Sequence, residues 1–570
     1  MPLTVGLISL GCPKNLIDSE IMIGHMQKAG MTMTPEPELA DVMVVNTCAF
    51  IDQAKQEAID AILDVVRARE SGAYPENQKL IVAGCLSQRF QKELPALLPE
   101  VDAFIGPDQV TKLPEIITKV MERTAPDKNF IEGKCKYVPD WDTPRYRLTP
   151  PHTAYIKIAE GCNHGCAYCI IPMIRGRHRS RSQQDVVREA EALIRSGVKE
   201  ICLIAQDITY YGMDKWTDAR PNRRSAVDSS RGESLASLIR ALNAIEGEFW
   251  IRLLYTHPAH WSDELTAAIA ESPKVARYVD IPLQHISGNM LSAMQRVTDG
   301  DYIRNLLRDI RKAVPGIAIR TTFITGFPGE TEDDHQELME FIEEFRFERA
   351  GIFTFSREEG TKAYKMPNQV HHRTKARRYN EATMLLTRLA SETGQEQIGR
   401  KIRVLVDAPG VARTEWDAPD IDGTVSVPLT LPVGEFATVT VTDAVAYELT
   451  AEKAAAIGQA GRKQDSGKPA RREPKYIVPS LLPGICAKGA YCFTLDSGRG
   501  ALTGGASCGA APEGDGEAES GTGTREVFMR DISSSREAAA ASGKQGPVRP
   551  CHVGSGDGIK AHHFLRIDYF

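Results

Sequence analysis

The sequence predicts an α/β protein with two parallel sheets, followed by a small antiparallel β domain. Two observations predict this class: apolar strand-like runs alternate with helical patterns over residues 1–122, and the alternation resumes over residues 148–389. A third is the change, beyond residue 400, to short segments of period two, which are typical of antiparallel strands. We therefore expect domains over 1–122, 148–389 and 392–456, with a linker over 123–147.

The first domain is expected to be a flavodoxin-like parallel sheet. Its apolar runs predict strands at Leu3–Leu10, Asp41–Asn46 and Lys79–Ala83. The intervening and following patterns predict helices at Asp18–Lys28, Ile51–Arg69 and Gln88–Leu98. Parallel strands need such crossover helices between them, so the alternation favours a parallel sheet.

The second domain is expected to be a partial (β/α)6 barrel. Six apolar runs predict its strands: Ala154–Glu160, Glu200–Ala205, Trp250–Tyr255, Tyr278–Pro282, Ile317–Ile324 and Gly351–Phe355. Helical patterns such as Gln184–Ser196 and Thr331–Phe345 separate several of them. The sites of such barrels gather at the carboxyl ends of the strands. The polar stretch Lys215–Gly232 is interpreted as a surface loop insertion.

The last part of the chain divides into a β domain and a tail. Period-two segments at Lys401–Val406, Gly423–Val427 and Phe436–Val441 predict a small antiparallel β domain. Residues 457–570 are rich in Gly, Ser, Ala and Arg and lack periodicity, so we expect a disordered tail. Its cysteines match no metal-binding pattern: Cys486, Cys492, Cys508 and Cys551.

The composition excludes several classes of protein. The formal net charge of −6 gives no general attraction to nucleic acid or to an anionic membrane. The chain has no run of about twenty apolar residues, and its N-terminus lacks a signal-peptide pattern. Twelve cysteines without such a signal favour metal or redox chemistry over disulfides. We expect a protein of the reducing cytoplasm with no membrane association.

The loop from Cys162 to Cys169 carries the clearest chemical signal. Cys162, Cys166 and Cys169 are spaced four and three positions apart, directly after a predicted strand. Three thiolates on one loop can hold three corners of a 4Fe-4S cluster and leave the fourth iron open. A structural zinc site would need four closed ligands, and no second cysteine pair lies nearby in the sequence. Three structural cysteines are the other alternative.

A second set of three cysteines follows the predicted strands of the first domain. Cys12, Cys48 and Cys85 each lie just past the carboxyl end of one strand. Parallel strands end at the same edge of their sheet, where the ligands of open α/β folds bind. The spacing favours a second cluster with three protein ligands. The alternative is three ordinary cysteines that happen to follow strands.

Other residues give weaker signals for cofactor binding. Gly326–Glu330 follows a predicted strand and could approach a cofactor, or it could be a simple turn. Gln284 and His285 end another strand and would face the same barrel mouth, although His285 could be structural. The basic segment Arg175–Arg181 is as consistent with a solvated loop as with contacts to cofactor or substrate. Cys202 is expected in the core, and Cys135 fits neither triad.

Taken together, these motifs resemble the radical S-adenosylmethionine methylthiotransferases. The resemblance covers roughly residues 3–450 and rests on Cys162–Cys169 with Tyr168, and on Gly11–Asn15, Asp18–Glu20, Asn46–Cys48, Ala83–Cys85, Arg175-Gly176, Ser180-Arg181 and Gly326–Thr331. It implies two 4Fe-4S clusters, held by Cys162, Cys166 and Cys169 and by Cys12, Cys48 and Cys85. It also implies a C-terminal TRAM domain.

The resemblance further implies the cofactor and its contacts. S-adenosylmethionine would be both the source of a deoxyadenosyl radical and the methyl donor, and an external electron donor would be needed. Its contacts would include Tyr168, Gln284, Gly326, Gly329 and Glu330. The resemblance assigns no catalytic residue beyond the cluster ligands.

Two branches of that family differ in substrate. RimO-type enzymes modify an aspartate of ribosomal protein S-twelve, whereas MiaB-type enzymes modify an isopentenyladenosine of tRNA near the anticodon. The sequence resembles the RimO type at Cys12–Asn15, Phe50–Asp52, Gln206-Asp207 and Asp280–Ser287. The resemblance therefore implies a ribosomal protein as the partner and makes tRNA unlikely.

The charge of the β domain points in the same direction. Residues 401–450 contain three basic and eight acidic residues. A module that binds tRNA should be basic, because phosphate contacts dominate nucleic-acid affinity. An acidic face would suit a basic ribosomal protein. The alternative is a solvated acidic face without a partner.

Overall fold

The computed structural model describes residues 2–124, 127–218 and 221–454. The predicted disordered tail, with its four cysteines, lies outside the described residues. Within the described residues, no helix is both long enough and apolar enough to span a bilayer.

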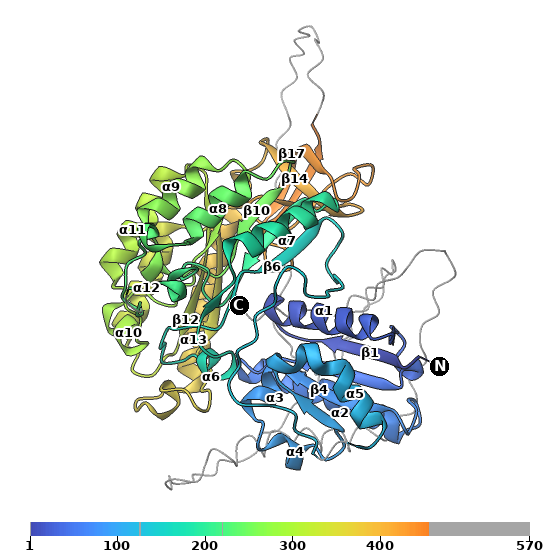
Figure 1. The fold of residues 1–570 in the computed structure, drawn as a ribbon. Helices are drawn as coiled ribbons and strands as arrows, with labels where there is room; N and C mark the ends of the chain where they lie inside the picture. The colour runs from blue at the N-terminus through green and yellow to red at the C-terminus, as the bar shows by residue number, and fades with distance from the viewer. Residues whose placement is uncertain (1, 125–126, 219–220, 455–570) are drawn as a thin grey trace, which may run out of the picture. The chain divides into compact units, whose positions relative to one another are not determined.

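The first domain is built on a five-stranded sheet. Its strands are β1 (Thr4–Ser9), β2 (Thr32–Met33), β3 (Val42–Thr47), β4 (Lys79–Gly84) and β5 (Ala103–Ile105). They lie in the order β2-β1-β3-β4-β5, and every neighbouring pair is parallel (Figure 1). This is the flavodoxin-like order, whose ligand crevice lies at the carboxyl ends of β1 and β3. The predicted fold of this domain is confirmed, although β2 and β5 were not predicted.

Helices cover both faces of this sheet. They are α1 (Pro13–Lys28), α2 (Asp52–Glu70), α3 (Cys85–Arg89), α4 (Leu94–Leu97) and α5 (Leu113–Met121). Ile17, Ile21 and Ile117 pack on one face, and Ile59, Ile62 and Leu86 pack on the other.

Two helix predictions for this domain need correction. Helix α1 begins at Pro13 rather than Asp18, because proline is favoured in the first helical turn. The single helix predicted at Gln88–Leu98 is wrong: α3 ends at Arg89, and α4 is a separate short helix.

The second domain contains the six predicted strands. They are β6 (Thr153–Lys157), β9 (Glu200–Ile204), β10 (Trp250–Leu253), β11 (Val275–Asp280), β12 (Ala318–Thr325) and β13 (Arg349–Thr354). All neighbours are parallel, in the order β13-β12-β11-β10-β9-β6. The described sheet is open, since β6 and β13 are its edges. A partial (β/α)6 barrel is therefore confirmed.

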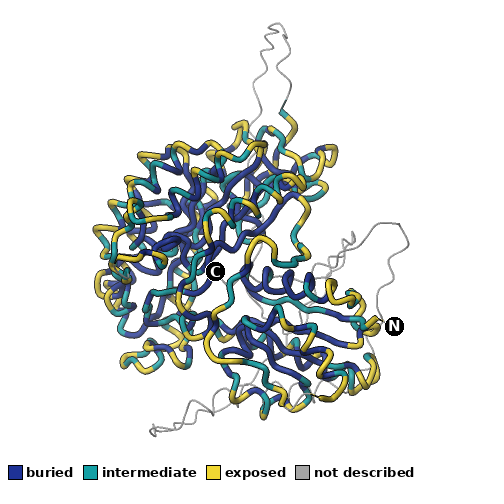
Figure 2. The backbone as a smooth tube through the Cα atoms, viewed as in Figure 1, coloured by how far each residue is buried: buried dark blue, intermediate teal, exposed yellow. Residues whose placement is uncertain are grey.

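Helices pack along the outer face of this curved sheet (Figure 1). They are α7 (Gln183–Arg195), α8 (Leu235–Asn243), α9 (Asp263–Glu271), α10 (Gly288–Ala293), α11 (Gly300–Ala313), α12 (Glu332–Phe345) and α13 (His372–Gln395). The tube in Figure 2 shows the strands as buried and the outward sides of these helices as exposed. Cys202 is fully buried in β9, as predicted. In the polar insertion, Trp216 is buried and its ring stacks with Arg231, so the insertion is partly packed.

The third domain is a small closed barrel. Its strands are β14 (Lys401–Ala408), β15 (Val411–Thr414), β16 (Val425–Ser426), β17 (Phe436–Val445) and β18 (Glu448–Lys453). They close in the order β14-β15-β16-β18-β17. The pairs are antiparallel except for β16 and β18, which are parallel.

Several acidic residues of this barrel form ion pairs inside the protein, so only part of its acidity can contribute to the predicted acidic face. Asp417 pairs with Arg349, Asp422 lies 3.4 Å from the guanidinium of Arg320, and Asp407 pairs with Arg413. Both Arg320 and Arg349 belong to the partial barrel. Four of the eight acidic residues between 401 and 450 are exposed: Asp420, Glu435, Asp443 and Glu448. The paired carboxylates therefore hold the small barrel in place, and the exposed ones face solvent.

A buried ion triad links the partial barrel to the small barrel. Glu200 in β9 lies 2.6 Å from the Arg252 guanidinium in β10 and 2.7 Å from the Arg413 guanidinium in β15. Burial acts to raise the pKa of Glu200, but the two arginines outweigh burial and hold that pKa below its usual range. The carboxylate is thus the shared partner of two buried cations.

We expect Glu200→Gln to destabilise the protein strongly. The amide keeps the shape of the side chain but leaves two buried guanidinium groups without their counter-charge, which costs about 3–5 kcal/mol in similar cases. Guanidinium chloride unfolding would measure the loss. The matched control is Glu248→Gln, which breaks the exposed pair with Arg403 and should change the midpoint little. A Glu200→Gln midpoint equal to the wild type would contradict the role given to this triad.

Candidate functional site

The second cysteine triad lies at the carboxyl edge of the first sheet. Cys12 follows β1, Cys48 follows β3, and Cys85 begins α3 directly after β4. Gly11 has a φ of +87°, and a Cβ atom there would lie 2.7 Å from the Cβ of Cys48. The glycine therefore allows the loop of Cys12 to lie against the loop of Cys48.

The three thiols of this triad are close enough to affect one another. Cys48 and Cys85 are buried, and Cys12 is half-buried. Burial raises the pKa of Cys48, and the charges of Cys85 and Cys12 raise it further. Thiolates that repel one another in a buried crevice are stabilised by a bound metal centre, which deprotonates its thiol ligands. This donor set fits an iron–sulfur cluster.

The first triad lies on the loop after β7 (Ala159–Glu160), which pairs with β8 (Arg179–Ser180). Backbone hydrogen bonds fix this loop: Cys162 N–H donates to the Gly176 carbonyl at 3.1 Å, and Ala167 N–H to the Met294 carbonyl at 2.9 Å. Burial and then Cys166 raise the pKa of Cys169 to about 12. Asp207 and the other two thiols add to the effect of burial on Cys162, whose pKa is raised well above its usual value. The loop thus presents a second set of mutually repelling thiols.

A buried ion network joins the elements that carry the two triads. Arg175, which follows the loop helix α6 (Ile171–Ile174), lies 2.6 Å from Asp18 of α1 and 3.3 Å from Glu160. Lys157 of β6 binds the same two carboxylates, at 2.6 and 2.8 Å. Burial opposes ionisation of Glu160, but Lys157 and Arg175 outweigh it and lower its pKa to about 2. Each carboxylate of this network thus contacts both buried cations.

Arg175 also reaches the second triad directly. Its guanidinium donates to the sulfur of Cys85 at 3.3 Å and to the Asn15 side-chain oxygen at 3.3 Å. The solvated-loop interpretation of Arg175–Arg181 is wrong at this residue, because Arg175 is buried. Asp18 and Arg175 were named from the sequence as parts of motifs, but the ion pair between them was not predicted. Their opposite charges were visible in the sequence, but their pairing across 157 positions was not.

The residues expected to contact the cofactor lie around the carboxyl ends of β11 and β12. Gln284 follows β11 with a left-handed φ of 73° and pairs with β12 through its backbone. Gly326 and Gly329 follow β12, with φ of 74° and 84°. The side chain of Tyr168 lies 3.5 Å from the Arg296 guanidinium. These positions agree with a shared mouth, and their contact with a cofactor stays a prediction.

The carboxylate of Glu330 is bound by neighbouring groups of the protein. Its carboxylate accepts from the Gly326 N–H, lies 3.1 Å from the Arg378 guanidinium and 3.5 Å from the His285 ring. These contacts give Glu330 a clear structural role in the turn after β12. His285 is likewise buried beside it.

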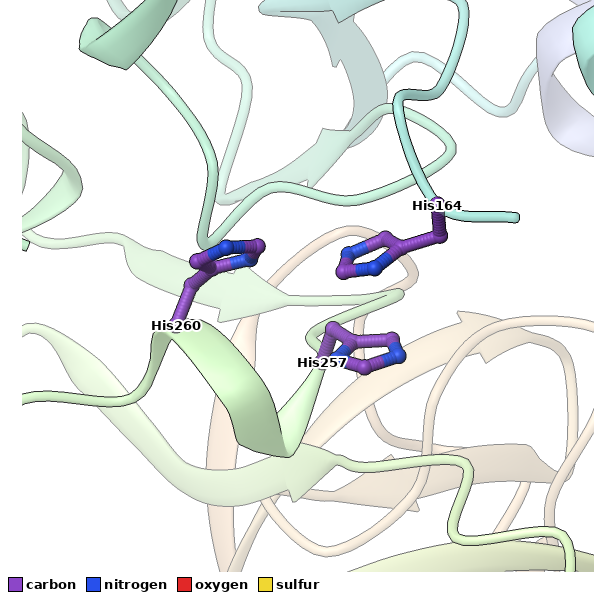
Figure 3. A group of neighbouring side chains, drawn as sticks. All are labelled: His164, His257 and His260. Carbon is purple, nitrogen blue, oxygen red and sulfur yellow. The ribbon is translucent and has the colours of Figure 1, made fainter. Parts of the chain in front are cut away.

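Three buried histidines lie close together, one of them in the loop of the first triad (Figure 3). Nitrogen atoms of His164, His257 and His260 come within 4.8 Å of one another. The rings of His164 and His257 stack at 3.7 Å between centroids, with 14° between their planes. Ring lone pairs lie in the ring plane, so one ion cannot lie in line with both stacked rings.

Asp207 holds this group of histidines in place. Its carboxylate lies 2.8 Å from His164 Nε2 and 3.4 Å from His260 Nδ1. Burial would raise the pKa of Asp207, but the hydrogen bonds from His164 and His260 hold it well below its usual value. Sequence reasoning missed these histidines. The available signal was His164 within the cysteine loop and the pair His257 and His260 directly after a strand.

Comparisons with known proteins agree with this division of the chain. Residues 4–106 match the uncharacterized protein family UPF0004, residues 156–342 match the radical SAM superfamily, and residues 398–453 match the TRAM domain. Among solved structures, the radical S-adenosylmethionine methyltransferase TsrM from Kitasatospora setae is 13% identical, with a TM-score of 0.44 over 64% of this chain and 74% of that chain.

Curated relatives are far more similar. The ribosomal protein uS12 methylthiotransferase RimO of Akkermansia muciniphila is 94% identical over 79% of this chain and 100% of its own length. The protein of that name from Opitutus terrae is 60% identical over 78% of this chain and 96% of its own length. The protein of that name from Desulforamulus reducens is 42% identical over 79% of this chain and 99% of its own length. The chain belongs to the RimO family of ribosomal protein uS12 methylthiotransferases.

Proposed function

We propose that this chain methylthiolates the β-carbon of an aspartate in ribosomal protein uS12, with S-adenosylmethionine as both radical source and methyl donor. The observation that carries the proposal is the pair of separate thiol triads joined by one buried ion network. The name shared by the relatives supplies the substrate. Because that substrate belongs to the small ribosomal subunit, we place the reaction in the cytoplasm.

In this proposal the six cysteines hold two 4Fe-4S clusters, Cys162, Cys166 and Cys169 one of them, and Cys12, Cys48 and Cys85 the other. When bound, the first supplies the electron that cleaves S-adenosylmethionine, and the second supplies the site of sulfur transfer. An external electron donor is required. The domains would be residues 1–122, 148–389 and 392–456.

The residues around the triads orient the thiolates and exclude water. Arg175 donates to the Cys85 sulfur, and the His164 N–H donates to the Cys162 sulfur at 3.4 Å. Such hydrogen bonds fix a ligand and tune the potential of its cluster. The ion pairs of Arg175 and Lys157 with Asp18 hold α1 against the loop of the first triad.

Substrate preference now rests on the relatives rather than on the acidity of the small barrel. Several of its acidic residues are engaged in internal ion pairs, so they give little evidence about a basic partner. A tRNA substrate remains the alternative that an experiment must exclude.

We expect the Cys162/Cys166/Cys169 triple alanine protein to retain half of the metal. After anaerobic reconstitution, the wild type should contain about eight iron atoms per chain and the variant about four, because each cubane cluster holds four. Iron and sulfide quantitation would measure this. Cys202→Ala, which alters a core cysteine outside both triads, should leave the iron content unchanged. Loss of all iron, or of none, would argue against two independent sites.

We expect Cys48→Ala to separate the two parts of the reaction. The variant should still cleave S-adenosylmethionine after reduction, because the first triad is intact, but it should form no methylthiolated product. Deoxyadenosine would be measured by chromatography and the product by mass spectrometry. A Cys48→Ala protein that still methylthiolates its target would refute the role of the second triad.

We expect the reconstituted enzyme to modify uS12 and not tRNA. The wild type would be incubated in parallel with uS12, with uS12 whose target aspartate is replaced by alanine, and with tRNA that carries isopentenyladenosine. Mass spectrometry should find the methylthio group in the first sample alone. Modification of the tRNA would overturn the proposed substrate.

A further inference from the structure

Lys14 is a buried cation without a carboxylate partner. The described residues contain three buried lysines: Lys14, Lys55 and Lys157. Lys55 pairs with Asp52 and Glu358, and Lys157 pairs with Asp18 and Glu160. Among the described residues, no carboxylate oxygen forms an ion pair with Lys14. A buried ammonium group without a counter-charge is costly, so its retention needs an explanation.

Lys14 lies beside the second triad and contacts a residue at the mouth of the partial barrel. It belongs to the first turn of α1, two residues after Cys12, and its ammonium lies 3.2 Å from the ring centroid of Tyr255. Tyr255 comes shortly after β10, at the carboxyl ends of the barrel strands. Ligands of parallel barrels bind at these ends, and ligands of the flavodoxin-like sheet bind beside β1. The ammonium therefore occupies a place that both domains offer to a ligand.

Tyr255 is held so that its ring faces this ammonium. Its backbone is left-handed, with a φ of 66°, and its N–H donates to Asp280 at 2.9 Å. An aromatic ring attracts a cation but does not neutralise it. The ring therefore contacts the Lys14 ammonium without forming an ion pair with it.

The two acidic residues whose charges act on Lys14, Asp280 and Glu160, form ion pairs with other cations. Asp280 lies 3.0 Å from the Arg320 guanidinium. Glu160 is shared by Lys157 and Arg175. Both carboxylates thus form their ion pairs with other cations, and the remaining negative group that acts on Lys14 is the thiol of Cys12. Within the described residues the ammonium has no carboxylate of its own, so a carboxylate from outside could bind it.

Among the buried lysines and arginines of the described residues, Arg296 is the other one that forms no ion pair with a carboxylate. Its guanidinium donates to the Pro282 carbonyl at 2.7 Å and lies 3.5 Å from the Tyr168 hydroxyl, so it belongs to the loop of the first triad. The proposed reaction brings in two carboxylates, one on the methionine part of S-adenosylmethionine and one on the substrate aspartate. Arg296 lies beside the cofactor loop, which leaves Lys14, beside Cys12, for the substrate.

We propose that Lys14 binds the side-chain carboxylate of the aspartate that is modified. This inference rests on the proposed function, because it takes an aspartate as the substrate. An ammonium group offers a point charge and three donors to a carboxylate. Lys14 would therefore select aspartate over a neutral group and hold its β-carbon between the two triads.

A double-mutant cycle on binding tests the proposal. The reconstituted enzyme, wild type or Lys14→Met, would be titrated in the presence of S-adenosylmethionine with fluorescently labelled uS12 that carries either the target aspartate or asparagine. We expect the wild type to bind the aspartate protein about tenfold or more tightly than the asparagine protein, as for a charged hydrogen bond. Lys14→Met should bind both equally, and Lys14→Arg should restore part of the preference.

Two controls keep the outcome clear. Lys55→Met removes a buried lysine of the same domain that is already paired, and it should keep the preference for aspartate. Lys14→Gln is a second neutral variant in case Lys14→Met does not fold, and iron content reports folding for each variant.

Several results would overturn the proposal. A Lys14→Met protein that keeps the preference for aspartate would do so. A loss of affinity for S-adenosylmethionine with the preference for aspartate retained would assign Lys14 to the cofactor instead. A wild type that neither binds nor modifies uS12 would overturn the proposed function and this inference with it. A wild type that modifies uS12 while Lys14 makes no difference would overturn this inference alone.

Discussion

The arrangement of the site depends on one buried network of four charges, Asp18, Lys157, Glu160 and Arg175. Two carboxylates and two cations neutralise one another in a place where any one of them alone would be very costly. Asp18 comes from the first domain and the other three come from the second. The network is therefore satisfied only when α1 lies against the loop of the first triad. The network fixes the position of α1 against this loop and need not add to the free energy of unfolding, since buried ion pairs often add little net stability.

The same principle operates at the opposite end of the partial barrel. Arg320 and Arg349 lie toward the amino ends of their strands and take acidic partners from the small barrel. In barrels of this kind the amino face serves stability, whereas the carboxyl face carries the ligands. The small barrel thus closes one end of the strands with charge pairs and leaves the other end to the triads. The acidic composition of the small barrel is therefore weak evidence about the substrate, because several of its carboxylates are paired inside the protein.

Much of the fold could be predicted because strands and crossover helices leave periodic patterns of apolar residues. The six barrel strands and the sheet of the first domain follow from those patterns, as does the convergence of Cys12, Cys48 and Cys85 at one sheet edge. The short strands β2 and β5 were missed, since two or three residues carry no readable period. Asp207 and Lys14 were also missed as site residues, and the role of Arg175 was left open between a solvated loop and a site contact. Their roles depend on contacts between distant segments, for which the chain has no local signal.

Lys14 and Arg175 show that the cations around the two triads have separate roles. Arg175 is a cation whose charge is fully balanced by Asp18 and Glu160, so it can orient Cys85 without attracting an anion. Lys14 is a cation of the same crevice that forms no ion pair with a carboxylate of the described residues, and its ammonium lies over the Tyr255 ring. Two buried cations of one crevice thus have different roles. The paired one fixes the protein, and the one without a carboxylate leaves a position that a carboxylate from outside would complete.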